Sequence, residues 1–150
     1  AFDKASPALD AISTQVFRLG EAPGAGSKLK MINQLLAGVH IAAMAEAMVL
    51  AKREGLDLQT VYDVIRVSAG SSWMFENRGP QVVGGDYTPY SAVDIFVKDL
   101  GIVTQTAGEV ELPLTGAALA LFEEAAAAGL GREADAAVAK TLAQKSGVDL

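Results

Sequence analysis

One long stretch of helical pattern constrains this chain more than any other feature. From Ser27 to Glu54 the sequence has no proline and a single glycine, Gly38. Gly55 comes directly after this stretch and is typical of a residue that ends a helix. The basic residues Lys52 and Arg53 lie in the last turn, where positive charge is favourable. At ~1.5 Å per residue such a helix is about 40 Å long, far beyond a typical element. It is therefore expected to bridge two domains or to form the centre of a bundle or dimer. Its apolar residues recur at helical spacing, at Ile32, Leu35, Leu36, Val39, Ala43, Ala47 and Leu50.

The sequence after this stretch is also typical of helices separated by glycine and proline. Asp57 is a suitable N-cap, Ser91 with Asp94 has the spacing of a capping box, and Pro113 is placed to open a helix. The stretch Val83–Pro89 has the composition of a loop. No repeat of fixed period is present, so we predict an all-α bundle of about six helices. The predicted segments after the long helix are 57–69, a short helix at 72–75, 91–107, 113–128 and 133–145.

The first 23 residues differ from the rest. Pro7–Ile12 could form a short helix, and Thr14–Leu19 is the one convincing strand pattern. Glu21–Gly26 has the composition of a linker. One helix and one strand cannot form a sheet alone, so residues 1–23 are expected to be the tail of an upstream α/β domain. Residues 24–150 are then the helical domain, and the start at Ala1 suggests a fragment or a processed chain.

Composition excludes several kinds of chemistry. The chain has no cysteine and one histidine, His40. It therefore offers no disulfide, no thiolate nucleophile and no histidine-based metal cluster. We predict no metal site.

Charge and hydropathy limit the expected partners. The net charge of −6 argues against nonspecific binding to nucleic acid or to an anionic membrane. No apolar run reaches ~18–20 residues without charged or several polar residues, so we expect no membrane span. The N-terminus lacks the basic start and apolar core of a signal peptide. A cytoplasmic location is the expectation.

A group of polar residues near the start of the long helix is the candidate for chemistry. Lys30, Asn33 and Gln34 are spaced i, i+3 and i+4, so they share one helix face. A positioned lysine can act as a general acid or base on an alcohol or carbonyl, and amides can hold a hydroxyl or carboxylate. A solvated first turn without chemical function remains the alternative.

Three blocks of sequence carry a resemblance to a known family. They are Gly24-x-Gly26-x-x-x-Lys30-x-x-Asn33, the segment Ile95–Gly101 and the segment Ser68–Trp73. In this order they resemble the β-hydroxyacid dehydrogenases, which include 3-hydroxyisobutyrate dehydrogenase, tartronate semialdehyde reductase and, more distantly, 6-phosphogluconate dehydrogenase. The stretches 34–40 and 72–78 are most similar to the L-threonate dehydrogenase branch of that family.

The resemblance implies an N-terminal NAD-binding Rossmann domain, of which residues 1–23 would be the C-terminal remnant. It implies that residues 24–150 form an all-helical domain like the C-terminal domain of 6-phosphogluconate dehydrogenase, with the long helix between domains. The implied activity is transfer of a hydride from a small 3-hydroxy acid, such as L-threonate or 3-hydroxyisobutyrate, to NAD or NADP. Lys30 would be the general acid/base, Asn33 and Gln34 would bind substrate, and Lys98 would bind the cofactor. The Rossmann domain and further copies of the chain, in a homodimer or homotetramer, are the implied protein partners.

The chain departs from the family pattern at two informative positions. Gln34 stands where many members have a second asparagine, which we interpret as a marker of substrate class. Ser91 stands where an aromatic residue is frequent, which puts ring stacking on the cofactor in doubt. Because the phosphate-binding loop belongs to the upstream domain, the helical domain alone is expected to be inactive. A noncatalytic helical dimerisation module is the alternative hypothesis.

Overall fold

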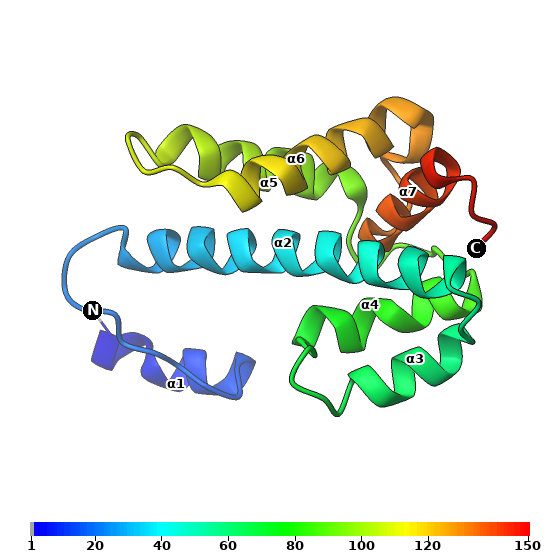
Figure 1. Cartoon of the computed structure of the whole chain (residues 1–150). Coiled ribbons are helices and arrows are strands. Elements are labelled where there is room, and N and C mark those ends of the chain that lie inside the picture. Colours follow the sequence, from blue (N-terminus) through cyan, green and yellow to red (C-terminus); the bar gives the residue numbers. More distant parts are fainter. Residues whose placement is uncertain (1) are drawn as a thin grey trace. The chain divides into compact units, whose positions relative to one another are not determined.

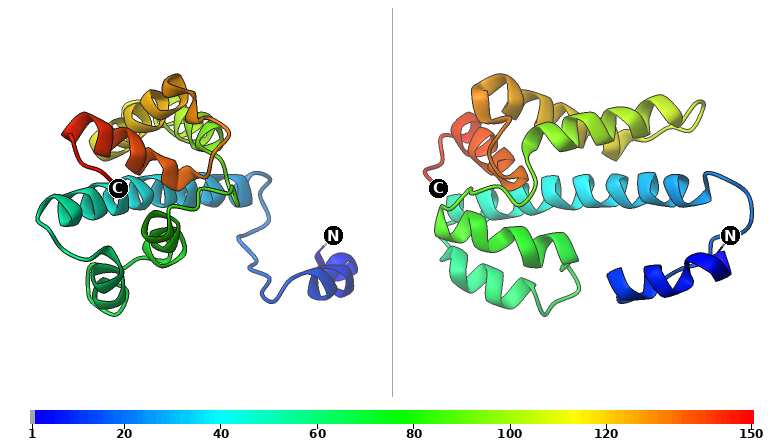
Figure 2. Two further views of the ribbon diagram at one scale, coloured as in Figure 1. Left: turned by 90° about the vertical axis from the view of Figure 1, so that its right-hand side faces the viewer. Right: turned by 180° about the vertical axis from the view of Figure 1, so that it is seen from behind.

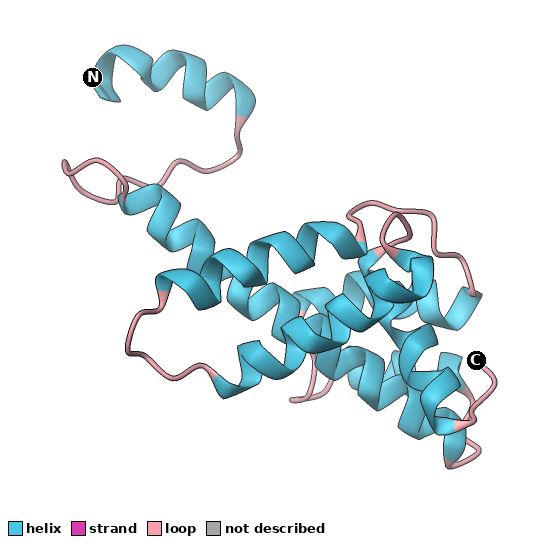
Figure 3. Ribbon diagram, turned by 90° about the horizontal axis from the view of Figure 1, so that it is seen from above, coloured by secondary structure: helices cyan, strands magenta, loops and turns pink. Residues whose placement is uncertain are grey.

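The computed structural model describes residues 2–150, and within them every regular element is a helix (Figure 3). This confirms the all-α prediction. The chain forms two compact units, one ending at Lys30 and the other spanning Met31–Leu150. The helices are α1 (Phe2–Ile12), α2 (Ala25–Arg53), α3 (Leu58–Ile65), α4 (Trp73–Gly84), α5 (Val93–Thr106), α6 (Pro113–Ala125) and α7 (Val138–Ser146), with the short turns η1 (Ala126–Leu130) and η2 (Asp135–Ala137).

The first unit has a helix but not the predicted strand. The helix α1 is longer than expected and contains Pro7. Residues 15–20 form neither helix nor strand, so the strand prediction for Thr14–Leu19 is wrong. A strand needs a neighbouring strand to satisfy its backbone groups, and no described residue supplies one. None of the residues 2–30 is buried.

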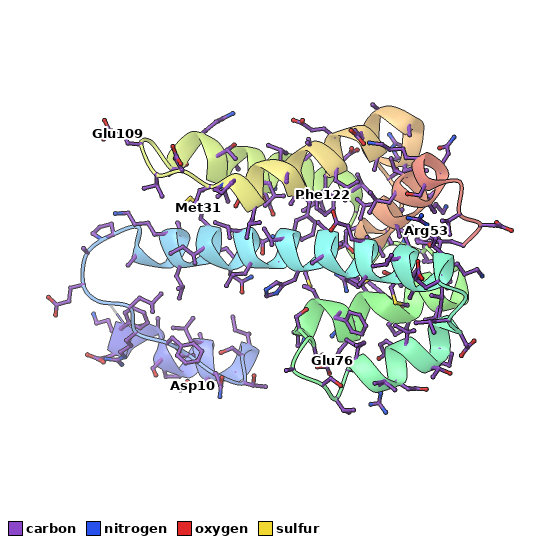
Figure 4. The ribbon with its side chains drawn as sticks, viewed as in Figure 1. Asp10, Met31, Arg53, Glu76, Glu109 and Phe122 are labelled. Carbon is purple, nitrogen blue, oxygen red and sulfur yellow. The ribbon has the colours of Figure 1, made fainter. Side chains whose placement is uncertain are left out.

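The second unit is built around α2 from Met31 onward, the greater part of the long helix that the sequence predicts. Helices α5 and α6 lie along one side of α2, and α3 and α4 lie along the other (Figures 1 and 2). Phe122 on α6 lies on the side that faces α2 (Figure 4), and its ring stacks on Phe96 of α5 at a centroid distance of 5.1 Å. Large side chains that are fully or almost fully buried fill this core, among them Ile41, Met44, Met48, Phe96, Leu100, Phe122 and Val138.

Several predicted helix ends are confirmed by their local chemistry. The Asp57 carboxylate accepts a hydrogen bond from the Thr60 amide at 2.8 Å and so caps α3. A hydrogen bond from the Thr60 hydroxyl, together with this bond from the Thr60 amide, lowers the pKa of Asp57. Pro113 opens α6, and Gly55 ends α2 in the left-handed region at φ 77°. The helix predicted at 72–75 continues to Gly84, and the helix predicted to reach residue 69 ends at Ile65.

The starts of α5 and α7 differ from the prediction for one shared reason. No side chain caps α5. Its first amides, those of Val93 and Asp94, donate instead to the carbonyls of Glu133 and Gly131 at 3.1 and 3.0 Å. Residues 131–134 are therefore held in a non-helical conformation, so α7 begins at Val138 and not at Glu133. A tertiary contact thus replaces the capping box that the sequence suggested.

The long helix also meets a length-and-composition criterion for a membrane span, contrary to the expectation from its charged residues. Its most apolar 18-residue window has a mean hydropathy of 1.6. Packing offers a different explanation, since 44% of that window is buried within the protein, including Ile41, Met44 and Met48. A core helix surrounded by other helices needs the same apolar composition.

A buried ion pair connects α4 to the turn before α7. The Arg78 Nε donates to Asp135 Oδ1 at 2.6 Å, and Nη2 donates to Oδ2 at 3.2 Å. The Asp135 side chain is fully buried and that of Arg78 is 9% exposed. Burial raises the pKa of Asp135, while its hydrogen bonds from Arg78 and Ser91 oppose that rise.

We predict that Asp135→Ala strongly destabilises the protein, because it leaves the Arg78 guanidinium buried without its carboxylate. Loss of one partner of a buried pair costs about 3–5 kcal/mol in free energy of unfolding. Urea titration monitored by circular dichroism measures this, with Asp149→Ala as a control that removes an exposed carboxylate. A double variant, Arg78→Met with Asp135→Leu, should recover most of the stability, since no unpaired charge remains. Equal stability of Asp135→Ala and Asp149→Ala would contradict this account.

Candidate active site

Three of the four predicted site residues lie on α2. Lys30 is exposed near the start of the helix, and Asn33 is exposed one turn later. Gln34 is half-buried. Because α2 is continuous from Ala25 to Arg53, the i, i+3 and i+4 spacing of these residues keeps them on one face.

A carboxylate on α5 joins the α2 residues to the fourth predicted residue. Gln34 Nε2 donates a hydrogen bond to Asp99 Oδ2 at 2.7 Å. The other oxygen of Asp99 lies 3.0 Å from the Lys98 ammonium. The Asp99 side chain is only 15% exposed, whereas that of Lys98 is 66% exposed. The structure therefore brings Gln34 and Lys98 to the same carboxylate, although 64 positions (98 − 34) separate them in sequence.

The series of polar contacts continues from Gln34 to Asn33. Asn33 Nδ2 donates to Gln34 Oε1 at 3.2 Å. Lys98, Asp99, Gln34 and Asn33 thus form one continuous series of polar side chains from α5 to α2. Such a series restricts how each amide can rotate.

The close approach of the two helices explains why these side chains can meet. A Cβ atom added to Gly38 would lie 2.9 Å from both terminal carbons of Leu100, which is fully buried. Because Gly38 has no side chain, the Leu100 side chain of α5 packs directly against the backbone of α2. Gly38 lies one turn beyond Gln34, and Leu100 is the residue after Asp99, so this contact sits directly beside the hydrogen bond.

Asp99 is the residue that the sequence analysis did not assign to the site. It lies within the segment that carries the family resemblance, directly after Lys98. The signal that could have found it is a carboxylate adjacent to a predicted binding lysine. Its contact with Gln34 depends on how α5 packs on α2, which the sequence alone does not specify.

Other ionisable groups with shifted pKa values lie elsewhere and have structural explanations. The Thr88 amide donates to Asp86, and hydrogen bonding to Thr88 lowers the pKa of that carboxyl. Burial, with a smaller effect of Glu133, raises the pKa of Tyr87. Across residues 2–150 no group of three or more metal-ligating side chains is found.

Comparison with known proteins assigns the chain to a family. Residues 24–149 match the family described as "NAD-binding of NADP-dependent 3-hydroxyisobutyrate dehydrogenase". The chain belongs to this family. That confirms the resemblance found in the sequence.

Named relatives within the β-hydroxyacid dehydrogenases are close in sequence. The chain is 61% identical over 142 residues to an L-threonate dehydrogenase of Cupriavidus necator, covering 93% of this chain and 48% of the relative. It is 57% identical over 142 residues to that of Escherichia coli K12, covering 93% and 47%. A crystal structure described as 3-hydroxyisobutyrate dehydrogenase from Salmonella typhimurium superimposes with a TM-score of 0.91 at 57% identity, covering 94% of this chain and 50% of the other. The chain therefore spans about half the length of the relatives it matches.

We predict that Gly38→Ala destabilises the protein although alanine is the better helix former. The added methyl group would lie 2.9 Å from both terminal carbons of Leu100, which is fully buried, and overpacking of a core costs about 1–3 kcal/mol. The matched control is Gly116→Ala on α6, where an added Cβ meets nothing within 4 Å. That control should gain about 0.5–1 kcal/mol from helix propensity. Thermal unfolding should show a lower melting temperature for Gly38→Ala and a higher one for Gly116→Ala. A higher melting temperature for Gly38→Ala would show that α2 and α5 can accommodate a methyl group at this position.

Proposed function

We propose that this chain is the C-terminal catalytic half of an NAD(P)-dependent dehydrogenase acting on a small 3-hydroxy acid. L-threonate is the first candidate substrate, because the named relatives at 57–61% identity are L-threonate dehydrogenases. The observation that carries the proposal is the convergence of Lys98 and Gln34 on Asp99, beside the helix face that also bears Lys30 and Asn33. The chain thus offers an amine and ordered amides, the groups needed to deprotonate and orient a hydroxy acid.

Lys30 is the proposed general base. As the C3–H bond of the substrate breaks and its hydride leaves, the neutral Lys30 amine takes the proton from the C3 hydroxyl and becomes an ammonium. The C–O bond becomes a carbonyl, so the product is a 3-oxo acid. In the reverse reduction the ammonium returns the proton. Asn33 and Gln34 bind substrate through their amides and hold the reacting hydroxyl toward the lysine.

Lys98 is the proposed cofactor-binding residue of this half. Its ammonium is exposed and held by Asp99 at 3.0 Å, which suits it to meet a phosphate or the edge of a nucleotide. When bound, the nicotinamide supplies the hydride acceptor. Most of the cofactor's contacts would come from the N-terminal Rossmann domain, and residues 1–23 would be its last part. The lack of buried residues in 2–30 supports this domain assignment, since such a segment needs a larger body to pack on.

Self-association as a homodimer or homotetramer is also part of the proposal. An apolar groove of about 300 Å³ lies between α2, α6 and α7. Its lining includes Val39, Ala43, Leu114, Leu121 and Leu142. A second copy of the chain could cover this surface, and the same observation favours the alternative of a noncatalytic dimerisation module. A cytoplasmic location is proposed on the same basis as the activity, namely the named bacterial relatives.

We predict that Lys30→Ala in the full-length protein lowers kcat for L-threonate by about 10²–10⁴, the usual contribution of general acid–base catalysis. NAD reduction followed at 340 nm measures the rate. The control is Lys28→Ala, which removes an exposed lysine from the same helix turn and should keep activity within about twofold. Unchanged circular dichroism in both variants shows that the fold is intact. Activity of Lys30→Ala within about tenfold of wild type would exclude the proposed base.

We predict that Lys98→Gln raises the KM for NAD or NADP by about tenfold, as expected for loss of a charged hydrogen bond. The KM for the hydroxy acid should change less, because Lys98 acts on the cofactor. Initial rates over both substrate concentrations separate the two constants. A rise confined to the KM of the acid would assign Lys98 to the substrate pocket.

A further inference from the structure

The long helix α2 carries an apolar stripe on its outer side, within the second unit. Ile32, Leu36, Ala43 and Leu50 are all exposed, and they follow one another at intervals of four or seven positions. At 3.6 residues per turn these intervals place the four side chains on one face of the helix. A continuous apolar stripe of this kind on a surface is typical of a contact with another protein.

The stripe borders a groove that follows α2 to its C-terminal end. The apolar groove between α2, α6 and α7 is joined by a second hollow of about 140 Å³, since Glu46 and Leu142 line both. The lining of the second hollow includes Leu50 and Arg53, and Arg53 lies near the end of α2 (Figure 4). We call the two hollows together the α2 groove.

Four charged residues line the α2 groove, and two of them are not paired. Lys145 and Glu124 form an ion pair at 2.6 Å. Glu46 and Arg53 are exposed and have no ion-pair partner among residues 2–150. They are seven positions apart, about 10 Å along the helix at ~1.5 Å per residue, which is too far for them to pair with each other.

These two charges define what a partner must offer. A charge that is buried without a counter-ion is strongly unfavourable. A partner that covers Leu50 must therefore supply a basic group to Glu46 and an acidic group to Arg53. An acyl chain or a lipid surface could cover the leucine, but it would leave both charges unpaired.

A second copy of this chain meets both requirements with the same residues. In an antiparallel contact about a twofold axis, each residue lies opposite the residue at the same distance on the other side of the axis. Leu50 is almost midway between Glu46 and Arg53 in sequence. An axis beside Leu50 therefore places Glu46 of each copy opposite Arg53 of the other. The two copies of Leu50, each 55% exposed in the single chain, then pack on each other.

We infer that the α2 groove is the surface on which two copies of this chain associate, through antiparallel α2 helices with Leu50 at the twofold axis and reciprocal Glu46–Arg53 ion pairs. The inference rests on the self-association included in the proposed function and specifies its surface. Symmetry favours this partner, because a surface with a negative, an apolar and a positive residue in a row is complementary to itself when it is turned around.

The test reverses the two charges in the full-length protein and measures the mass of the assembly by size-exclusion chromatography with light scattering. Glu46→Arg places two arginines opposite each other, and Arg53→Glu places two glutamates there, and the twofold axis doubles each effect. Each single variant should raise the dissociation constant of the contact by about 100-fold or more, so that the assembly falls to half its mass. The variant with both substitutions restores opposite charges in exchanged order and should return to the wild-type mass.

The control is Glu109→Arg, which reverses an exposed charge in the loop between α5 and α6 (Figure 4) and should leave the mass unchanged. Unchanged circular dichroism in all variants shows that the fold is intact. Wild-type mass in both single variants, or half the mass in the double variant, would overturn the inference and leave self-association through another surface. A monomeric wild-type protein would overturn self-association as well. Because oxidation of a hydroxy acid is not measured, failure of the proposed catalysis would not affect this result.

A second measurement locates the axis. The chain has no cysteine, so Leu50→Cys introduces a single thiol into this half of the protein. A residue beside a twofold axis meets its own copy, and a short bismaleimide should therefore link two copies at this position in high yield. Val67→Cys, at a residue that is 76% exposed after α3, should link no more than the unsubstituted protein does. Equal yields at the two positions would contradict an axis at Leu50.

Discussion

The close approach of α2 and α5 at Gly38 sets the geometry of the candidate site. With no Cβ on α2 at this point, the terminal carbons of Leu100 fill the space that a side chain would take. Asp99 is thereby brought within 2.7 Å of Gln34. A wider separation of the helices would break this bond, and the polar series from Lys98 to Asn33 would lose its link. The geometry of the candidate site therefore depends on an apolar contact between Gly38 and Leu100, neither of which belongs to the site.

The rest of the second unit supports that contact from both sides of α2. Stacking of Phe96 on Phe122 fixes α5 against α6. The backbone bonds from Val93 and Asp94 to residues 131–133 fix the start of α5, and the buried pair of Arg78 and Asp135 fixes the following turn to α4. The site residues themselves are mostly exposed and add little to stability. A packed helical scaffold of this kind can hold polar side chains in fixed positions, as a binding site requires.

Most of the helices could be predicted from the sequence, because the residues that start, continue or end a helix lie close to each other in the chain. The long helix followed from the lack of proline and the single glycine between Ser27 and Glu54, and Asp57 and Pro113 marked helix starts through their own backbone chemistry. The strand at Thr14–Leu19 was wrong because a strand pattern describes a residue's preference and not the presence of a partner strand. The start of α7 was wrong because residues 131–134 satisfy the amides of α5 in place of a capping box.

The sequence by itself determined the helical class, the length of α2 and the placing of Lys30, Asn33 and Gln34 on one helix face, since all of these depend on residues within a few positions of each other. Only the tertiary structure decided that Asp99 meets Gln34. That contact joins residues 65 positions apart in the chain. Its existence depends on the distance and register between two helices, which are set by the packing of side chains such as Leu100 and not by any local pattern.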